Sequence, residues 1–241
     1  MRFLGWGGSD QPGEAVNSIV AGGVIAIVRL PSADVLVPAA EAIREGGVTA
    51  VEVTPTTPGA VQASGPARVK LGRSIFLGLG SVLTPEAARD AIRAGAEFLV
   101  APNLNPDVVR VGREAGVPVI PGAFTPTEIV QAWDLGASLV KVFPAGHAGA
   151  GYIKEILISL PDVRLVPAGG ISLENVGEFI RAGAAAVGVG DEMVPKDALA
   201  GREFSDITRR TRAFVEAVQR ARGQVERPPQ PVRPIEGPDT R

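Results

Sequence analysis

One arrangement recurs along the chain and restricts its fold: a helical stretch ends at Gly, and an apolar, strand-like run begins immediately afterwards. It is found at 45–48, 94–97, 115–118, 135–138 and 182–185. Gly is favoured there because the left-handed conformation that ends a helix costs it little. Counted from Gly46, the intervals are 49, 21, 20 and 47 residues, so two of them hold one unit and two hold two units. This spacing predicts a strand–helix unit repeated about every 20 to 25 residues.

Counting by this unit gives eight short strands. They are expected at 24–29, 49–54, 74–80, 97–101, 117–121, 138–143, 163–168 and 184–189. Helices should fill the gaps, most clearly at 34–45, 84–94, 125–135 and 172–182. Strict alternation with eight strands predicts an α/β fold of the parallel (β/α)8, or TIM-barrel, type, and 241 residues suit one such domain.

Three hydroxyl residues, Thr84, Thr125 and Ser172, are expected to cap the starts of helices. A last helix at 204–221 places Ile207, Phe214, Val215 and Val218 on one face, which suits docking on the barrel. The expected organisation is an N-terminal extension at 1–14, the barrel at 15–222, and a proline-rich, extended or disordered tail at 223–241.

The composition points to small-molecule chemistry without a metal. A net charge of −2 and a pI of about 5.6 give no electrostatic reason to expect nucleic acid or an anionic membrane as partner. With no cysteine and the single histidine His147, thiolate or imidazole-rich metal sites are not expected, although an all-oxygen magnesium site stays open. We expect no cofactor and a cytoplasmic protein, since neither a signal segment nor a long apolar run is evident.

Lys141 lies inside the apolar run 138–145, which reads as a buried strand. Burial favours the neutral form of an amine, and a neutral lysine is a nucleophile that can form a Schiff base with a carbonyl substrate. The chain has only four lysines against 20 arginines, and the other three lie in helix-like or loop-like sequence. The alternative is that the stem of Lys141 packs in the barrel while its head reaches the strand end.

Two further charges lie on or beside predicted strands. Glu52 is embedded in the second strand and, as a proton shuttle with a raised pKa, could work beside Lys141 at the barrel mouth, where active sites of such barrels lie. The alternative is a plain buried ion pair, which seldom stabilises more than packed apolar groups do. Arg29 ends the first strand and could clamp a substrate carboxylate.

Glycine clusters follow the strands where phosphate-binding barrels present backbone amides. They are Gly169 and Gly170 after the seventh strand and Gly188 and Gly190 after the eighth. The alternative is that these glycines only make tight turns. Ser81, after the third strand, offers a hydroxyl as a substrate contact.

Five motifs in order resemble those of the 2-keto-3-deoxy-6-phosphogluconate (KDPG) / 4-hydroxy-2-oxoglutarate (KHG) aldolases. They are the segments 47–54, 78–84, 119–128, 140–145 and 167–171, and the similarity runs from about 15 to 220. The resemblance implies a class I aldolase on a (β/α)8 barrel that releases pyruvate and an aldehyde, usually as a homotrimer. It also implies roles for eight residues: Lys141 as the Schiff-base lysine, Glu52 as the acid/base group, Arg29, Ser81 and Phe143 in the substrate pocket, and Gly169, Gly170 and Gly190 at the phosphate site.

Three positions depart from the family pattern. Asp191 stands in the phosphate region where the family usually has Ser, and Ala168 stands where Thr is common. A carboxylate beside a phosphate dianion lowers affinity unless it points away or pairs with a cation. The segment 55–57 lacks an arginine that some members use for the pyruvate carboxylate. An unphosphorylated 2-keto-3-deoxy acid therefore stays open as substrate, as do a phosphate-binding barrel isomerase or synthase and a catalytically lapsed oligomeric scaffold.

Overall fold

The structure, a computed structural model, describes residues 13–55 and 59–224. The predicted proline-rich tail from residue 225 onward and the first 12 residues of the predicted extension lie outside the described residues, as do Thr56 and Thr57. Within the described ranges, no helix combines the length and apolar character needed to cross a bilayer.

Strands and helices alternate along the chain as the repeat predicts. The strands are β1 Val24–Val28, β2 Ala50–Val53, β3 Phe76–Leu79, β4 Phe98–Val100, β5 Val119–Ile120, β6 Gly122–Ala123, β7 Val140–Val142, β8 Leu165–Pro167 and β9 Val187–Val189. The helices are α1 Glu14–Gly22, α2 Leu36–Glu45, α3 Ala60–Leu71, α4 Pro85–Arg93, α5 Pro106–Glu114, α6 Pro126–Asp134, α7 Gly149–Ser159, α8 Val176–Arg181, α9 Lys196–Ala200 and α10 Phe204–Gly223. Two 3-10 turns lie at Ala33–Val35 and Gly72–Ser74.

The fold is α/β, and its strands pair in parallel in two curled sheets. One sheet has the order β5-β4-β3-β2-β1-β9 and the other β6-β7-β8. The predicted fifth strand, 117–121, is divided at Pro121, because β5 pairs with β4 while β6 pairs with β7. Proline has no amide hydrogen for a ladder, but its carbonyl still accepts from the backbone amide of Lys141 at 2.8 Å. The chain thus passes from one sheet to the other at this residue.

The helix starts at Thr84 and Thr125 are confirmed. The Thr84 hydroxyl accepts from the amide of Ala87, and Thr125 forms a capping box with Glu128. The start predicted at Ser172 is wrong: α8 begins at Val176. The amide of Ser172 donates to the Asn175 side chain at 2.9 Å, which forms a turn instead of the first helical turn.

The helix-ending glycines adopt the expected left-handed conformation, with one shift in position. In the segments around 95, 116, 136 and 183 the predicted Gly has a positive φ, whereas in the first segment it is Gly47, with φ 101°, and not Gly46. Gly46 is needed for a different reason. A Cβ there would lie 2.4 Å from the Cβ of Thr211, so its smallness lets α10 pack closely against the end of α2.

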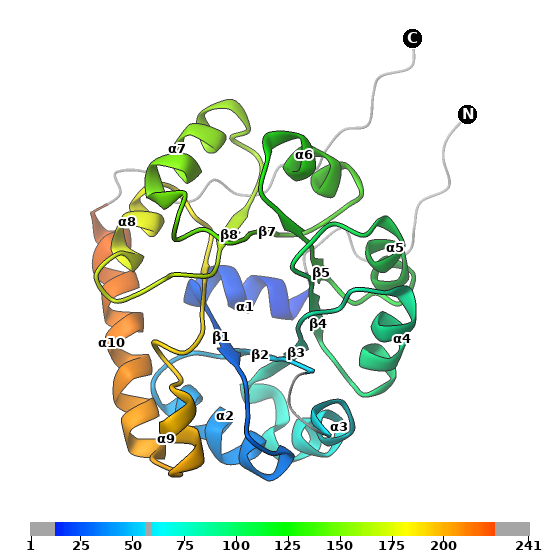
Figure 1. The fold of residues 1–241 in the computed structure, drawn as a ribbon, viewed down its shortest axis with the longest axis vertical. Coiled ribbons are helices and arrows are strands. Elements are labelled where there is room, and N and C mark those ends of the chain that lie inside the picture. Colours follow the sequence, from blue (N-terminus) through cyan, green and yellow to red (C-terminus); the bar gives the residue numbers. More distant parts are fainter. Residues whose placement is uncertain (1–12, 56–58, 225–241) are drawn as a thin grey trace.

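The core has an inner and an outer part. The inner cluster joins Val16 and Ile19 of α1 to strand residues of both sheets, among them Ile25, Phe98 and Val166. Figure 1 shows the strands in the middle of the molecule, α1 crossing between them, and the other helices around the outside. The outer cluster fills the space between strands and helices. Predicted residues of the last helix take part in it: Ile207, Phe214 and Val218 are buried, and Val215 packs against it.

Candidate active site

Lys141 and Glu52 meet inside the fold although they come from different sheets. Lys141 is the central residue of β7 and Glu52 the third residue of β2. Their side chains are only 10% and 3% exposed, and Nζ of Lys141 lies 3.8 Å from Oε1 of Glu52. The other three lysines, Lys70, Lys154 and Lys196, are exposed. The two charges that the sequence places inside buried strands are therefore neighbours.

Glu52 is packed into a space that a glycine leaves free. A Cβ at Gly80, directly after β3, would lie 2.1 Å from Oε1 of Glu52. Burial raises the pKa of Glu52, while the positive charges of Lys141 and Arg29 oppose this effect without cancelling it. A carboxyl group that holds its proton at a higher pH than usual is better suited to donate a proton as well as to accept one. Gly80 was not predicted as a site residue from the sequence, where it belongs only to the motif segment 78–84.

Phe143 forms one wall beside the lysine. It lies two residues beyond Lys141 and is 39% exposed, and its ring centroid is 5.4 Å from Nζ of Lys141. It also packs against the loop after β8, since a Cβ at Gly169 would come within 2.9 Å of the ring. The aromatic ring thus lies close to both the lysine and the glycine loop, directly after the carboxyl end of β7.

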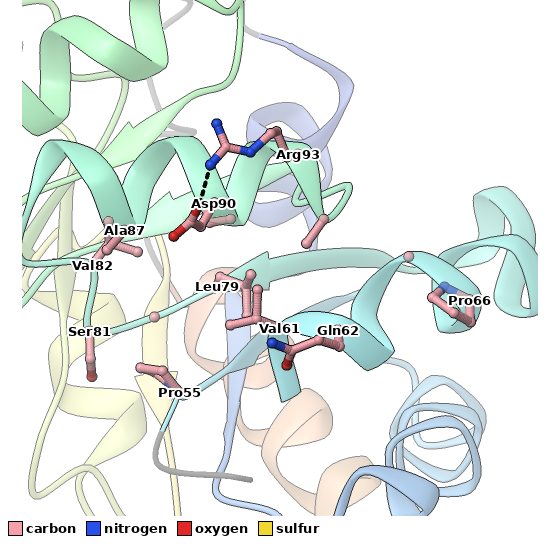
Figure 2. Close-up of a pocket in the computed structure, with 14 residues that line it drawn as sticks. Pro55, Val61, Gln62, Pro66, Leu79, Ser81, Val82, Ala87, Asp90 and Arg93 are labelled. Carbon is pink, nitrogen blue, oxygen red and sulfur yellow. Dashed lines mark hydrogen bonds and ion pairs between the residues drawn. The ribbon is translucent and has the colours of Figure 1, made fainter. Parts of the chain in front are cut away.

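Ser81 follows β3 and has an unusual backbone. Its φ is 54°, a conformation rare for residues other than glycine and found preferentially at functional sites. Ser81 and Pro55 lie at one end of a cavity of about 700 Å³ between α3 and α4, which extends outward to the Asp90–Arg93 ion pair of α4 (Figure 2). Gly80 also lines this cavity, so the cavity adjoins the surroundings of Glu52.

Arg29 and Asp191 are brought together at the ends of neighbouring strands. Arg29 follows β1, Asp191 lies shortly after β9, and these two strands pair in parallel. Nη1 of Arg29 lies 3.2 Å from Oδ1 of Asp191, with side chains 42% and 56% exposed. Gly190 lies beneath the guanidinium, since a Cβ there would be 3.2 Å from Nη1. From the sequence, the Asp191 carboxylate could lie beside an anion site either by pointing away from it or by pairing with a cation. In the structure it pairs with a cation, the Arg29 guanidinium.

The glycines after β8 fold against another glycine that the sequence did not single out. Gly169 and Gly170 both have φ of 80°. The amide of Gly146, after β7, donates to the carbonyl of Gly169 at 2.7 Å, and a Cβ at Gly170 would lie 2.9 Å from the Cα of Gly146. These glycines therefore do make tight turns, because the backbones approach too closely to leave room for side chains. It leaves their use in anion binding open.

The charged groups near the site do not form a metal centre of the usual kind. Across residues 13–55 and 59–224, no group of three His, Cys, Asp or Glu side chains is placed to hold an ion. His147 lies exposed in the loop after β7. The chemistry on hand is the amine of Lys141 beside the carboxyl group of Glu52, with the Arg29 guanidinium and the Ser81 hydroxyl after the neighbouring strands β1 and β3.

Comparison with known proteins identifies the family to which the chain is similar. The family model described as KDPG and KHG aldolase matches residues 16–210. A 2-dehydro-3-deoxy-phosphogluconate aldolase of Treponema pallidum (strain Nichols) is 39% identical over 186 residues, which cover 77% of this chain and 88% of the relative. A KHG/KDPG aldolase of Escherichia coli (strain K12) is 31% identical, over 85% of this chain and 96% of the relative.

Among solved structures, KDPG aldolase from Legionella pneumophila, with pyruvate captured at low pH as a covalent carbinolamine intermediate, has a TM-score of 0.78. It is 30% identical, over 83% of this chain and 98% of that chain. The extent of these matches, together with the shared α/β architecture, leads to one assignment. This chain belongs to the KDPG and KHG aldolase family of lyases.

Proposed function

We propose that the protein is a class I aldolase in which Lys141 forms a Schiff base with a 2-keto-3-deoxy acid and releases pyruvate and an aldehyde. The observation that carries the proposal is the buried Lys141–Glu52 pair, with 3.8 Å between Nζ and Oε1. An amine held next to a single carboxyl group, in a site closed to most water, has the two functional groups that imine chemistry requires.

The reaction begins when the neutral amine of Lys141 attacks the C2 carbonyl carbon of the substrate. Loss of water gives a protonated imine, which accepts the electron pair of the C3–C4 bond as that bond breaks. C4 leaves as the carbonyl carbon of the aldehyde, and the enamine of pyruvate, formed from C1 to C3, stays on the lysine. Protonation of the enamine carbon and attack of water on the imine then release pyruvate and the free amine.

Glu52 accepts and donates the protons that these steps transfer. Its carboxylate takes the proton of the C4 hydroxyl as the aldehyde forms, and the resulting acid donates a proton to the enamine carbon. The raised pKa of Glu52, which burial causes, suits this double role because the acid form persists long enough to donate. The chemistry is complete with these two groups and water.

Three further residues surround the reacting atoms in this proposal. Phe143 covers the imine with its ring, and Ser81 offers its hydroxyl to the substrate next to Glu52. Arg29, whose charge reaches Glu52, attracts the anionic substrate to the mouth. The glycine loop at Gly169 and Gly170 borders the end of the pocket that receives the aldehyde part of the substrate.

We propose that the two sheets close into one (β/α)8 barrel around this site. Three observations support closure. Pro121 joins β5 to β6 without an intervening helix, and Ala168, directly after β8, forms a parallel bridge with Gly188, the central residue of β9. In addition, the inner apolar cluster draws residues from both sheets. Barrels of this kind place their active sites at the carboxyl ends of the strands, where Arg29 and Ser81 lie.

The substrates named for its relatives are the first to test. They are 2-dehydro-3-deoxy-phosphogluconate for the Treponema enzyme, KHG and KDPG for one Escherichia coli enzyme, and 2-dehydro-3-deoxy-6-phosphogalactonate for another. All are 4-hydroxy-2-keto acids or contain that unit, which is the part that the Lys141–Glu52 pair would process. We propose this class of small-molecule substrate for the present chain.

We also propose that the protein is a homotrimer, as the family resemblance implies. Large apolar side chains outside the substrate pocket are exposed after β3 and β6, among them Leu83 and Phe124. Exposed apolar groups favour contact with another protein surface, here a second and third copy of the chain. Light scattering coupled to size-exclusion chromatography measures the molecular mass directly, and a monomer would contradict this part of the proposal.

The function is tested by following pyruvate release from KDPG and KHG with purified Lys141→Arg and Lys154→Arg. Arginine keeps the positive charge but cannot form an imine, so Lys141→Arg should lose activity by at least about 10⁴-fold, whereas the exposed Lys154 should tolerate the change. A phosphate-binding isomerase or synthase would release no pyruvate, and a lapsed scaffold would turn over neither substrate. Full activity in Lys141→Arg would reject the imine.

A further inference from the structure

We infer that the Arg29–Asp191 ion pair makes this enzyme prefer a 2-keto-3-deoxy acid that ends in an uncharged hydroxyl group over one that ends in a phosphate dianion. The inference rests on the proposed aldolase function, because it concerns the aldehyde end of the same substrate. It assigns to Asp191 a role in substrate selection that the chemistry at Lys141 does not require.

The pair is fixed by the fold at the edge of the mouth. Strands β1 and β9 run side by side in parallel register, with Ala26 opposite Val189, so the residues that follow them emerge at the same edge. The Nη1–Oδ1 distance of 3.2 Å is a single contact and not a bidentate pair. The guanidinium therefore has donors left over for a ligand, while its positive charge is already balanced by a carboxylate of the protein.

Arg29 belongs to the same site as the reacting groups. Ile27 of β1 lies opposite Glu52 of β2, and Arg29 follows Ile27 by two residues at the end of the strand. The charge of Arg29 also lowers the pKa of Glu52 against the larger, opposite effect of burial. A substrate held between Lys141 and Glu52 therefore meets the Arg29–Asp191 pair when it extends toward β1 and β9.

The surroundings of the pair favour a hydrogen-bond donor over a second anion. Asp191 is followed by Glu192, and both are exposed, so the loop after β9 carries two consecutive carboxylates. At the end of β8, where a side-chain hydroxyl could donate to a phosphate, Ala168 presents only a buried methyl group. A phosphate dianion can only accept hydrogen bonds, and the same is true of the Asp191 carboxylate, so the two cannot form a hydrogen bond with each other. A terminal hydroxyl can donate to Asp191 and accept from Arg29.

The size of the effect follows from the charges. Repulsion between two unit charges about 4 Å apart in water corresponds to about fivefold in an equilibrium constant. A phosphate near Asp191 carries nearly two charges, so the carboxylate should weaken its binding by about 5- to 30-fold. Salt should reduce this penalty, because both groups are exposed to solvent.

The test compares 2-keto-3-deoxygluconate with its 6-phosphate as substrates of the purified, full-length protein. KM is measured for the wild type, for Asp191→Asn, and for the control Glu216→Gln. Glu216 pairs with Arg220 on α10, and its side chain is 56% exposed, so the control removes the same charge from an ion pair outside the site. Asp191→Ser is a second variant that must change KM in the same directions.

The wild type should have the lower KM for the unphosphorylated acid. Asp191→Asn should lower KM for the phosphate by about fivefold or more, because the repulsion is removed. It should raise KM for the unphosphorylated acid by about two- to threefold, because a neutral carbonyl accepts a hydrogen bond less strongly than a carboxylate. Glu216→Gln should leave the ratio of the two KM values unchanged.

Two results would overturn the inference: a wild type with a lower KM for the phosphate, or Asp191 variants whose KM ratio equals that of the wild type. Trapping of pyruvate on the protein with borohydride separates this failure from a failure of the proposed function, since pyruvate lacks the distal end. If Lys141 is labelled while the KM ratio stays fixed, the aldolase function survives and the role of Asp191 is rejected. If neither the wild type nor any Asp191 variant is labelled, the aldolase function and the role of Asp191 are both rejected.

Discussion

Gly80→Ala tests whether the exact place of the Glu52 carboxyl group matters for turnover. The new Cβ would lie 2.1 Å from Oε1 of Glu52 and 2.8 Å from its Cδ and Cγ. Ordinary contact begins at 3.4 Å, so the carboxyl group must move by about 1.3 Å. Gly80 does not have a positive φ, and its backbone therefore accepts alanine without strain. The effect should come from the clash alone.

A shift of about 1 Å in a reacting group costs about 100-fold in rate, so kcat of Gly80→Ala should fall by about that factor. The overpacking should lower the free energy of unfolding by about 1–3 kcal/mol. Trapping of pyruvate by borohydride should fall less than turnover does, because Lys141 itself is not displaced. The assays are steady-state pyruvate release, borohydride trapping and thermal unfolding.

Gly151→Ala is the matched control, since a Cβ at this position in α7 meets no atom within 4 Å. It should keep its activity and gain slightly in stability from the better helix propensity of alanine. The reasoning is refuted if folded Gly80→Ala turns over within about threefold of the wild type. It is equally refuted if Gly151→Ala loses as much activity as Gly80→Ala.

Three further results are expected. Glu52→Gln should lower kcat by about 100-fold or more while imine trapping persists, and an unchanged kcat would leave only a structural ion pair. Because burial raises the pKa of Glu52 above 4.5, the stability due to its protonated form is complete below pH 4.5 and is lost as pH rises through the folded-state pKa. The Tm of Glu52→Gln relative to the wild type should therefore increase as the pH rises above 4.5, and a constant Tm difference would contradict the raised pKa. Ser81→Gly should unfold at a higher Tm than Ser81→Ala, because glycine adopts the φ of 54° with about 1 kcal/mol less strain. Both variants lose the hydroxyl and should bind substrate more weakly. Equal Tm values would show that the backbone is not strained.

Much of the fold could be predicted from the sequence because its signals are local. Seven of the eight expected strands appear as single strands near their predicted positions, and Thr84 and Thr125 cap helices as expected. Two of the errors also have local causes. Pro121 divides the fifth strand, and the Asn175 side chain closes a turn ahead of α8, so that Ser172 stays outside the helix.

The pairing of Lys141 with Glu52 could be anticipated because each is a charge inside an apolar strand that needs a partner. The contacts of Arg29 with Asp191 and of Gly146 with Gly170 could not, since they depend on which strands are neighbours and how their ends are staggered. The packing of Gly80 against Glu52 was hidden for the same reason. Local patterns thus identify the reacting groups, whereas the residues that position them become visible only in three dimensions.

Whether Lys141 forms the imine is tested most directly by treating the protein with pyruvate and borohydride. Peptide mass spectrometry then locates the label. We expect one reduced pyruvyl group per chain on Lys141, and none in Lys141→Arg. The exposed lysines Lys70, Lys154 and Lys196 serve as internal controls in the same digest. Label on one of these instead of Lys141, or no label at all, would contradict this expectation.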